Sequence, residues 1–205
     1  MARLSQEGSE LVAACPTPGR AYFDLLRIVV PTVHCRLSTD HCILRRQEAP
    51  LAWVDDRIFA AGGDHIPAHW DEFAGQTGIT AVLHLRPDQP AAFLGVPPES
   101  FLWIGMASEG EADLEARWLA GRFVLGCLEA GGRVLLHSSQ GRHRVRWAYV
   151  AQLICAGRSV AAALDAAEVR PWLSPYPTDR QAWENFAQLV EARSAERVAA
   201  GTPLR

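Results

Sequence analysis

Apolar residues in the second half of the chain follow two different spacings, which predict strands and helices in alternation. Short apolar runs bounded by glycine, proline or polar residues predict strands at 78–87, 101–104 and 134–136. Apolar residues that recur on one helical face predict helices at 111–130, 145–157 and 160–169. Together these elements predict an α/β fold with a central, mostly parallel sheet flanked by helices. Ligands are then expected at the carboxyl ends of the strands.

A polar loop joins the strand at 134–136 to the helix that follows it. A strand, a short loop and a helix N-terminus together aim backbone N–H groups and the positive end of a helix dipole at an anion. Arg144, at the last position of the loop, adds a guanidinium that binds two phosphate oxygens at once. Arg142, His143 and Arg146 complete a local cationic cluster. The loop is therefore a predicted phosphate-binding site.

Composition mainly excludes other classes of protein. The 205 residues, 49% of them hydrophobic and 21% charged, suffice for one sizeable core and predict a soluble protein. A net charge of −3 gives no general attraction to nucleic acid or to an anionic membrane, so anion binding depends on the local cluster. No apolar run approaches the ~18 residues of a membrane span, and the first residues lack the apolar core of a signal peptide. We therefore expect a cytoplasmic protein that binds no nucleic acid.

Residues 1–50 precede these elements and are predicted to form an extension that packs on the main domain. An apolar stretch at 22–30 predicts a helix or strand, and polar residues at 38–40 predict a hairpin turn. The hairpin carries His-Cys pairs at 34–35 and 41–42, but their spacing matches no zinc site, so we predict no metal. The five cysteines of the chain have no regular spacing, which favours free thiols over disulfides.

The loop also carries a recognisable motif. His137 and Arg144 are separated by six residues, with Gly141 between them, which resembles the signature His-Cys-x5-Arg of the cysteine-dependent protein tyrosine phosphatases. The chain from Leu51 to about Leu189 is most similar to the dual-specificity subgroup. The similar segments are an opening strand that ends in glycine (53–62), a strand of the pattern Gly-Ile-x-x-Val-Leu-x-Leu (78–85), and a closing helix with Arg-Pro, Gln and Phe (170–186). A short helix is predicted between the two strands, at 68–74.

The resemblance implies a dual-specificity phosphatase-like domain at 51–193, between the N-terminal extension and a tail at 194–205. In that family a cysteine thiolate attacks a phosphomonoester and forms a phosphocysteine intermediate, without a metal or other cofactor. The implied ligand is a phosphorylated protein or a small phosphomonoester. Its phosphoryl group would be bound by consecutive loop residues, namely Ser139, Gln140, Gly141, Arg142, His143 and Arg144. His137 would stabilise the loop.

The nucleophile position holds Ser138 instead of cysteine. A serine hydroxyl needs an adjacent base to become a useful nucleophile, and no residue of the loop is placed to serve as one. Either the serine is an introduced Cys→Ser change that preserves binding and removes turnover, or it is native and the protein is a pseudophosphatase. We favour the first because Gly141 and Arg144 are both retained. A third hypothesis, motivated by Arg142 and His143, is a phosphatase for phosphoinositides or other non-protein substrates.

Two further positions bear on turnover. The resemblance implies a general acid on a loop about thirty residues before the nucleophile, where the family carries aspartate. No aspartate occupies that place in this chain, and Glu109, 29 residues before Ser138, is the candidate. The residue after Arg144, a hydroxyl residue in the family, is Val145. Because that hydroxyl helps the thiolate to leave, its absence predicts slow hydrolysis of the phosphoenzyme.

Overall fold

A five-stranded sheet lies at the centre of the molecule. The computed structural model describes residues 52–87, 93–170, 173 and 179–199. The strands are β1 (Ala52–Asp55), β2 (Ile58–Gly62), β3 (Ala81–Leu85), β4 (Ser100–Trp103) and β5 (Val134–Ser138). Their order is β1-β2-β5-β3-β4, and all neighbouring pairs are parallel except the antiparallel pair β1–β2. The predicted α/β class with a mostly parallel sheet is therefore confirmed.

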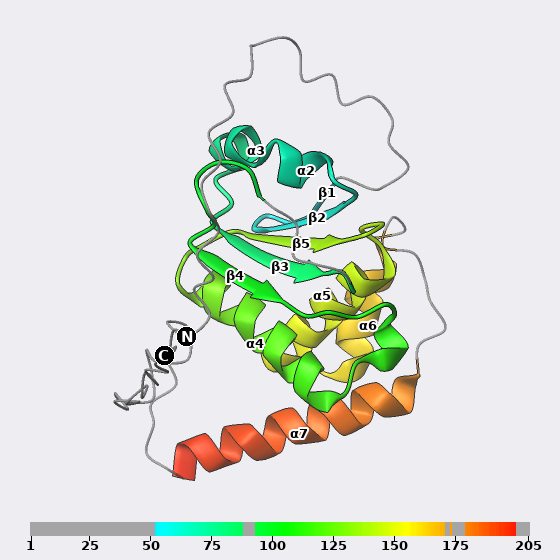
Figure 1. Ribbon diagram of the computed structural model, residues 1–205. Helices are drawn as coiled ribbons and strands as arrows, with labels where there is room; N and C mark the ends of the chain where they lie inside the picture. Colours follow the sequence, from blue (N-terminus) through cyan, green and yellow to red (C-terminus); the bar gives the residue numbers. More distant parts are fainter. Residues whose placement is uncertain (1–51, 88–92, 171–172, 174–178, 200–205) are drawn as a thin grey trace, which may run out of the picture.

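Helices cover both faces of this sheet (Figure 1). The helices α2 (His65–Ala68) and α3 (Trp70–Thr77) lie on one face, and α4 (Leu114–Glu129), α5 (His143–Cys155) and α6 (Val160–Glu168) lie on the other. The last helix, α7 (Arg180–Ala199), packs against α4, α5 and α6 on the side away from the sheet. A 3₁₀ turn, η1 (Glu109–Glu111), precedes α4. Of the helices in the described ranges, none is long and apolar enough to cross a membrane.

The core fills both sides of the central strand, β5. Because successive side chains of a strand point to opposite faces, Leu135 packs in the cluster that contains Trp70 of α3. Val134 and Leu136 pack in the larger cluster that α4, α5, α6 and α7 cover. All three β5 residues are completely buried. A strand covered on both faces needs such a continuous apolar run, which is why the sequence pattern identifies it.

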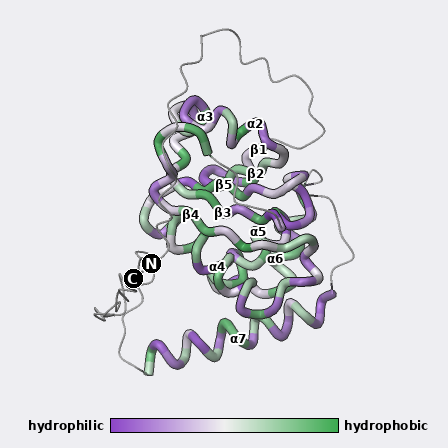
Figure 2. The backbone as a smooth tube through the Cα atoms, viewed as in Figure 1, coloured by the Kyte–Doolittle hydropathy of each residue, from purple (hydrophilic) through white to green (hydrophobic). Residues whose placement is uncertain are grey.

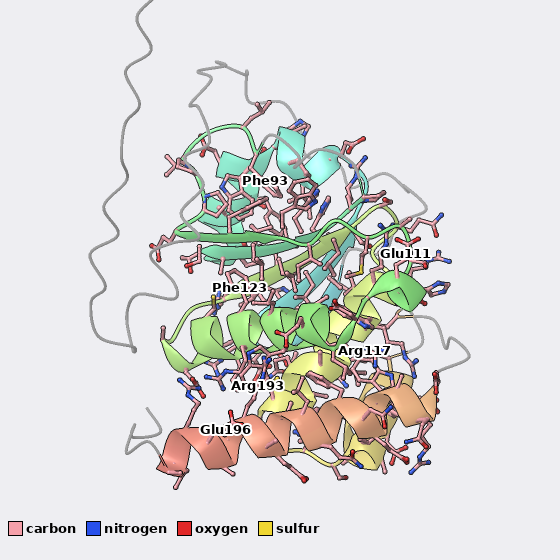
Figure 3. The ribbon with its side chains drawn as sticks, turned by 60° about the horizontal axis from the view of Figure 1, so that its bottom comes forward. Phe93, Glu111, Arg117, Phe123, Arg193 and Glu196 are labelled. Carbon is pink, nitrogen blue, oxygen red and sulfur yellow. The ribbon has the colours of Figure 1, made fainter. Side chains whose placement is uncertain are left out.

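Hydrophobic and hydrophilic residues alternate along α7 (Figure 2), and the helix joins this core through a few buried side chains. Its buried side chains are those of Trp183, Phe186 and Val190. Two arginines connect it to α4 (Figure 3). Arg117 donates a hydrogen bond to the Ala182 carbonyl at 2.7 Å, and Arg193 pairs with Glu115. Since partly exposed ion pairs contribute little, burial of the apolar side chains is the main source of the attachment.

Some element boundaries differ from the predicted ones for local reasons. The segment 53–62, predicted as one strand, is a hairpin, because the Asp55 carboxylate accepts hydrogen bonds from the N–H groups of Arg57 and Ile58 and turns the chain. The helix predicted at 68–74 is divided into α2 and α3, because His69 leaves the helical conformation with a φ of −125°. At the other end of the chain, α7 continues through Ser194 as far as Ala199.

Two helices begin at other residues than predicted. The helix α4 begins at Leu114, where the Asp113 side chain caps it by accepting a hydrogen bond from the Ala116 N–H at 2.7 Å. The helix α5 begins at His143, two residues earlier than predicted. Arg144 therefore lies in the first helical turn and not in the loop, so its position is fixed by the helix.

The end of β2 and the loop after β5 approach each other more closely than side chains would allow. A Cβ on Gly62 would lie 2.3 Å from the carbonyl carbon of Gln140, and one on Gly141 would lie 2.5 Å from that of Ala61. Gly141 also has a φ of 67°, a conformation that favours glycine. These two glycines therefore fix how the loop lies against β2.

We expect Gly62→Ala to lower the free energy of unfolding by about 2 kcal/mol, because an added methyl group must push the loop away from β2. Gly75→Ala is the matched control. Gly75 lies within α3, and a Cβ there meets nothing within 4 Å. Alanine at this helical position should raise the free energy of unfolding by about 0.5 kcal/mol or more. Urea denaturation measures both, and a Gly62→Ala variant as stable as the wild type would contradict the close contact.

Candidate functional site

The predicted phosphate-binding loop lies at the carboxyl end of β5, where it leads into α5. The neighbouring strands β2 and β3 run parallel to β5, so all three end at the same edge of the sheet. The helix α5 is 13 residues long, and its N-terminus begins directly after Arg142. The positive end of its dipole therefore faces the loop, as the binding of an anion requires.

Ser138 is the last residue of β5 and lies at the base of the loop. Its side chain is buried, and its Oγ accepts a hydrogen bond from the Gly141 N–H at 2.9 Å. Within the described part of the chain, no acidic or basic side chain forms a hydrogen bond with this hydroxyl. A backbone N–H aimed at this position would also stabilise negative charge on an atom there.

Arg144 is held at the edge of the loop by two other elements of the fold. Its Nη1 donates hydrogen bonds to the carbonyl of Leu85, at 2.8 Å, and to that of Met106, at 2.9 Å. Leu85 ends β3 and Met106 follows β4, so three segments of the chain fix one guanidinium. A side chain that is already ordered loses less conformational entropy when it binds a ligand.

The other predicted phosphate-binding residues differ in exposure. Gly141 is buried, Ser139 and His143 are half-buried, and Gln140 and Arg142 are exposed. The arginines of the cationic cluster predicted from the sequence do not all lie at the loop. Arg142 is the last residue of the loop and is exposed, whereas Arg146 is buried further along α5 and approaches Glu168 of α6 to 3.6 Å. Arg146 therefore joins two helices, while Arg142 and Arg144 flank the loop.

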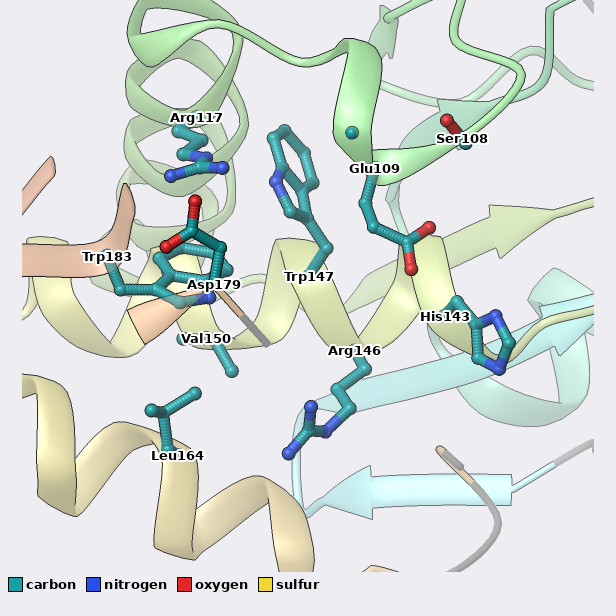
Figure 4. A pocket seen from close by; sticks show the side chains of 11 residues that line it. Ser108, Glu109, Arg117, His143, Arg146, Trp147, Val150, Leu164, Asp179 and Trp183 are labelled. Atoms are coloured by element: carbon teal, nitrogen blue, oxygen red, sulfur yellow. The ribbon is translucent and has the colours of Figure 1, made fainter. Parts of the chain in front are cut away.

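Glu109, the candidate general acid, lies in η1 opposite the first turn of α5 (Figure 4). Glu109 and His143 line a cavity of about 150 Å³ that extends along α5 to Trp147 and Trp183. The Oε1 atom of Glu109 is buried and has no hydrogen-bond partner among the described residues. The structure thus brings this carboxyl group next to the residues that end the loop. Its role as an acid stays a prediction.

His137 lies beneath the loop and is completely buried. Its Nε2 is 2.7 Å from the carbonyl oxygen of Gly63, in the turn between β2 and α2. The Gly63 N–H in turn donates a hydrogen bond to the Ser139 carbonyl at 2.9 Å. His137 therefore contacts the loop through a neighbouring turn, which supports the stabilising role that we predict for it.

A second buried histidine, His84, is not among the predicted site residues. It lies opposite His137 in the β3–β5 pair, with the two Nδ1 atoms 3.0 Å apart. Its ring lies between those of His137 and Phe101, nearly parallel to the His137 ring. In the sequence, the only indication of His84 was that a titratable residue stands inside an otherwise apolar strand. An ion pair between Arg86 and Asp64 links the end of β3 to the β2–α2 turn, and no sequence pattern predicted it.

Burial lowers the pKa of both histidines, to about 3 for His84 and about 4 for His137. Loss of hydration is the main cause, because the charged form of an imidazole is strongly stabilised by water. The positive charges of Arg86 and Arg144 lower both pKa values further, and the negative charge of Asp64 acts in the opposite direction. Both imidazoles are therefore neutral at neutral pH.

The described cysteines do not replace the missing nucleophile. Cys127 and Cys155 are free thiols, and burial raises their pKa to about 11 and about 12, so both remain protonated. Over the same part of the chain, no three His, Cys, Asp or Glu side chains converge as metal ligands would. The His-Cys pairs at 34–35 and 41–42 and the predicted hairpin that carries them lie outside the described residues.

Solved structures with a similar fold include dual-specificity phosphatases. No protein-family model matches the sequence, and neither does any curated protein. Human DUSP28 is 23% identical, with a TM-score of 0.54 over 71% of this chain and 95% of that one. DUSP15 is 21% identical, with a TM-score of 0.53 over 72% and 96% of the two chains. PTPMT1, in complex with PI(5)P, is 18% identical, with a TM-score of 0.55 over 69% and 96%. The chain therefore has the fold of the dual-specificity phosphatases.

We expect the protein to lose stability as the pH falls from 6.5 towards 4. Both histidines have lower pKa values in the folded than in the unfolded state, so the unfolded state binds more protons over this range. At pH 5 one such histidine lowers the free energy of unfolding by about 2 kcal/mol relative to neutral pH. Above pH 6.5 both imidazoles are neutral in the folded and in the unfolded state, so neither changes the free energy of unfolding.

Urea denaturation at pH 7.5 and pH 5 measures this loss. The variant His84→Asn has one buried imidazole fewer and should lose less stability between the two values. Equal free energies of unfolding of the wild type at both values would show that the two imidazoles are not held neutral by burial.

Proposed function

We propose that this chain binds phosphomonoesters through residues 139–144, in the loop and the first turn of α5, as a dual-specificity phosphatase does, and that phosphorylated protein is its class of ligand. With cysteine at position 138, the site would hydrolyse the ester through a phosphocysteine intermediate. With Ser138 it binds the phosphoryl group and does not turn it over. The proposal includes the domain limits 51–193 and the cytoplasmic location expected from the sequence.

One arrangement carries the proposal: the Gly141 N–H points at Ser138 Oγ inside a loop that opens a 13-residue helix, while Arg144 is held beside it. A phosphoryl group has several charged oxygens, and this loop offers them backbone N–H groups, a helix N-terminus and a guanidinium. These are groups that bind phosphate well in proteins. The same donors would stabilise the charge that develops on the equatorial oxygens during transfer.

Turnover depends on the ionised state of the nucleophile. A helix N-terminus and neighbouring cations lower the pKa of a cysteine towards neutrality, but a serine hydroxyl requires a base that removes its proton. The Gly141 N–H donates its hydrogen bond to Ser138 Oγ, so it cannot accept the proton of the hydroxyl. An introduced serine and a native one in a pseudophosphatase both fit this chemistry, and they differ in whether cysteine restores activity.

A second candidate function is recognition of phosphoinositides. Arg142 is exposed beside the loop, where it would attract a ligand with more than one phosphate. PTPMT1, which has a similar fold, was solved in complex with PI(5)P. Inositol phosphates and phosphopeptides, titrated against the same protein, distinguish the two functions.

Arg144→Ala should weaken the binding of inorganic phosphate by about tenfold to a hundredfold, because it removes charge-assisted hydrogen bonds. Arg158→Ala is the matched control, since Arg158 is exposed and follows the opposite end of α5. This control should bind phosphate within about twofold of the wild type, because it removes the same charge from a distant position. Titration followed by NMR measures both affinities, after circular dichroism has shown that the variants are folded. Unchanged affinity in Arg144→Ala would remove the guanidinium from the site.

Ser138→Cys should switch on hydrolysis of an aryl phosphate in a chain that shows none with serine. Because Val145 offers no hydroxyl to the leaving thiolate, hydrolysis of the phosphocysteine should be slow. The phenol released in the first step should therefore appear in a burst. Adding Val145→Ser should raise the steady-state rate and reduce the burst.

Adding Glu109→Gln to the cysteine variant tests the general acid. Turnover should fall for an alkyl phosphate, whose leaving group needs a proton, and much less for an activated aryl phosphate. If Glu109→Gln left the turnover of the alkyl phosphate unchanged, Glu109 would be excluded as the acid. A folded Ser138→Cys variant without activity would favour a native pseudophosphatase.

A further inference from the structure

The two buried histidines form a direct hydrogen bond beneath the loop. His84 and His137 are both 0% exposed, their rings lie 5.0 Å apart and nearly parallel, and their Nδ1 atoms are 3.0 Å apart. Phe93 packs edge-on against both rings. Two nitrogens at this distance share one proton, so one imidazole donates and the other accepts.

The surroundings decide which imidazole is the donor. The carbonyl oxygen of Gly63 only accepts hydrogen bonds, so His137 Nε2 carries a proton and donates to it at 2.7 Å. A neutral imidazole has one N–H, which leaves His137 Nδ1 as an acceptor. His84 Nδ1 must then carry the proton between the rings, and His84 Nε2 is unprotonated. Consistent with this tautomer, His84 Nε2 has no hydrogen-bond partner among the described residues.

This chain of hydrogen bonds continues to the backbone of the loop. Gly63 accepts from His137 through its carbonyl and donates to the Ser139 carbonyl through its N–H. The Ser139 carbonyl is thereby turned outwards, towards the β2–α2 turn. Because a trans peptide unit directs its C=O and the following N–H to opposite sides, the Gln140 N–H is turned away from the β2–α2 turn.

We propose that His84 is a positioning residue of the phosphate loop, which holds His137 in the tautomer that fastens Gly63 and, through Gly63, the Ser139 carbonyl. The hydrogen bond itself is independent of the proposed function. Its effect on ligand binding rests on that function, because it assumes that the loop binds phosphate. His84 contacts no ligand and acts only through His137.

Two substitutions at His84 distinguish the effect of losing the hydrogen-bond donor from the effect of changing the shape of the side chain. His84→Phe keeps an aromatic ring between His137 and Phe101 and removes the donor. His84→Asn places an amide N–H close to where Nδ1 lies, so it keeps the donor and removes the ring. A residue that only fills space would be replaced better by phenylalanine, whereas a positioning residue would be replaced better by asparagine.

NMR of nitrogen-15-labelled protein tests the hydrogen bond in the wild type. We expect His137 to be protonated at Nε2 and His84 at Nδ1, with a scalar coupling between the two Nδ1 nuclei across the hydrogen bond. A proton on His137 Nδ1 would overturn the proposal, and this arm needs no variant to fold. Amide hydrogen exchange at Gly63 should be faster in His84→Phe than in His84→Asn, because only the former releases the turn from His137. Equal exchange in both would also overturn it.

Titration with inorganic phosphate tests the consequence for binding. Affinity should fall roughly tenfold in His84→Phe and stay within about twofold of the wild type in His84→Asn. Equal affinity in both variants would overturn the positioning role. A wild-type protein that binds no phosphate would refute the proposed function, while the tautomer and the exchange at Gly63 would still decide whether His84 holds the turn.

Discussion

Backbone lies directly against backbone where the end of β2 meets the loop after β5, and the shape of the candidate site depends on that contact. Gly62 and Gly141 lack the side chains that would separate the two segments. The approach brings Gly63 within hydrogen-bonding distance of both Ser139 and His137. Without it, the loop would be joined to the sheet only through β5 and α5.

Recognition and turnover rest on different parts of this arrangement. The backbone N–H groups, the start of α5 and the anchored Arg144 require only the fold, and they are present with serine at position 138. Turnover also requires an ionised nucleophile, a proton donor and a group that assists the second step. In this chain the nucleophile position holds Ser138 and the position after Arg144 holds Val145, while Glu109 is the predicted proton donor. The geometry therefore favours binding more strongly than catalysis.

The fold and the loop were predictable from the sequence because both depend on local patterns. The buried strand at 134–136 is a continuous apolar run, and the motif from His137 to Arg144 is contiguous. Contacts between distant residues were not predictable in this way. His84 meets His137 only because β3 pairs with β5 in one register, and Gly62 matters only because β2 lies on the other side of β5. The start of α5 was misplaced because Val145 opens the apolar pattern, whereas the helical backbone begins at His143.

The position of β5 in the sheet also has a consequence for how the protein is made. Among the described strands, β5 is the last in the chain and the central one in the sheet. A growing chain can form the β1–β2 hairpin and pair β3 with β4, but β2 and β3 stay apart until residues 134–138 have left the ribosome. Until then, each pair exposes an open inner edge, which is prone to pair with other chains. Insertion of β5 closes both edges and brings the loop after β5 to β2 in the same event, so a nascent chain has no candidate site before its sheet is complete.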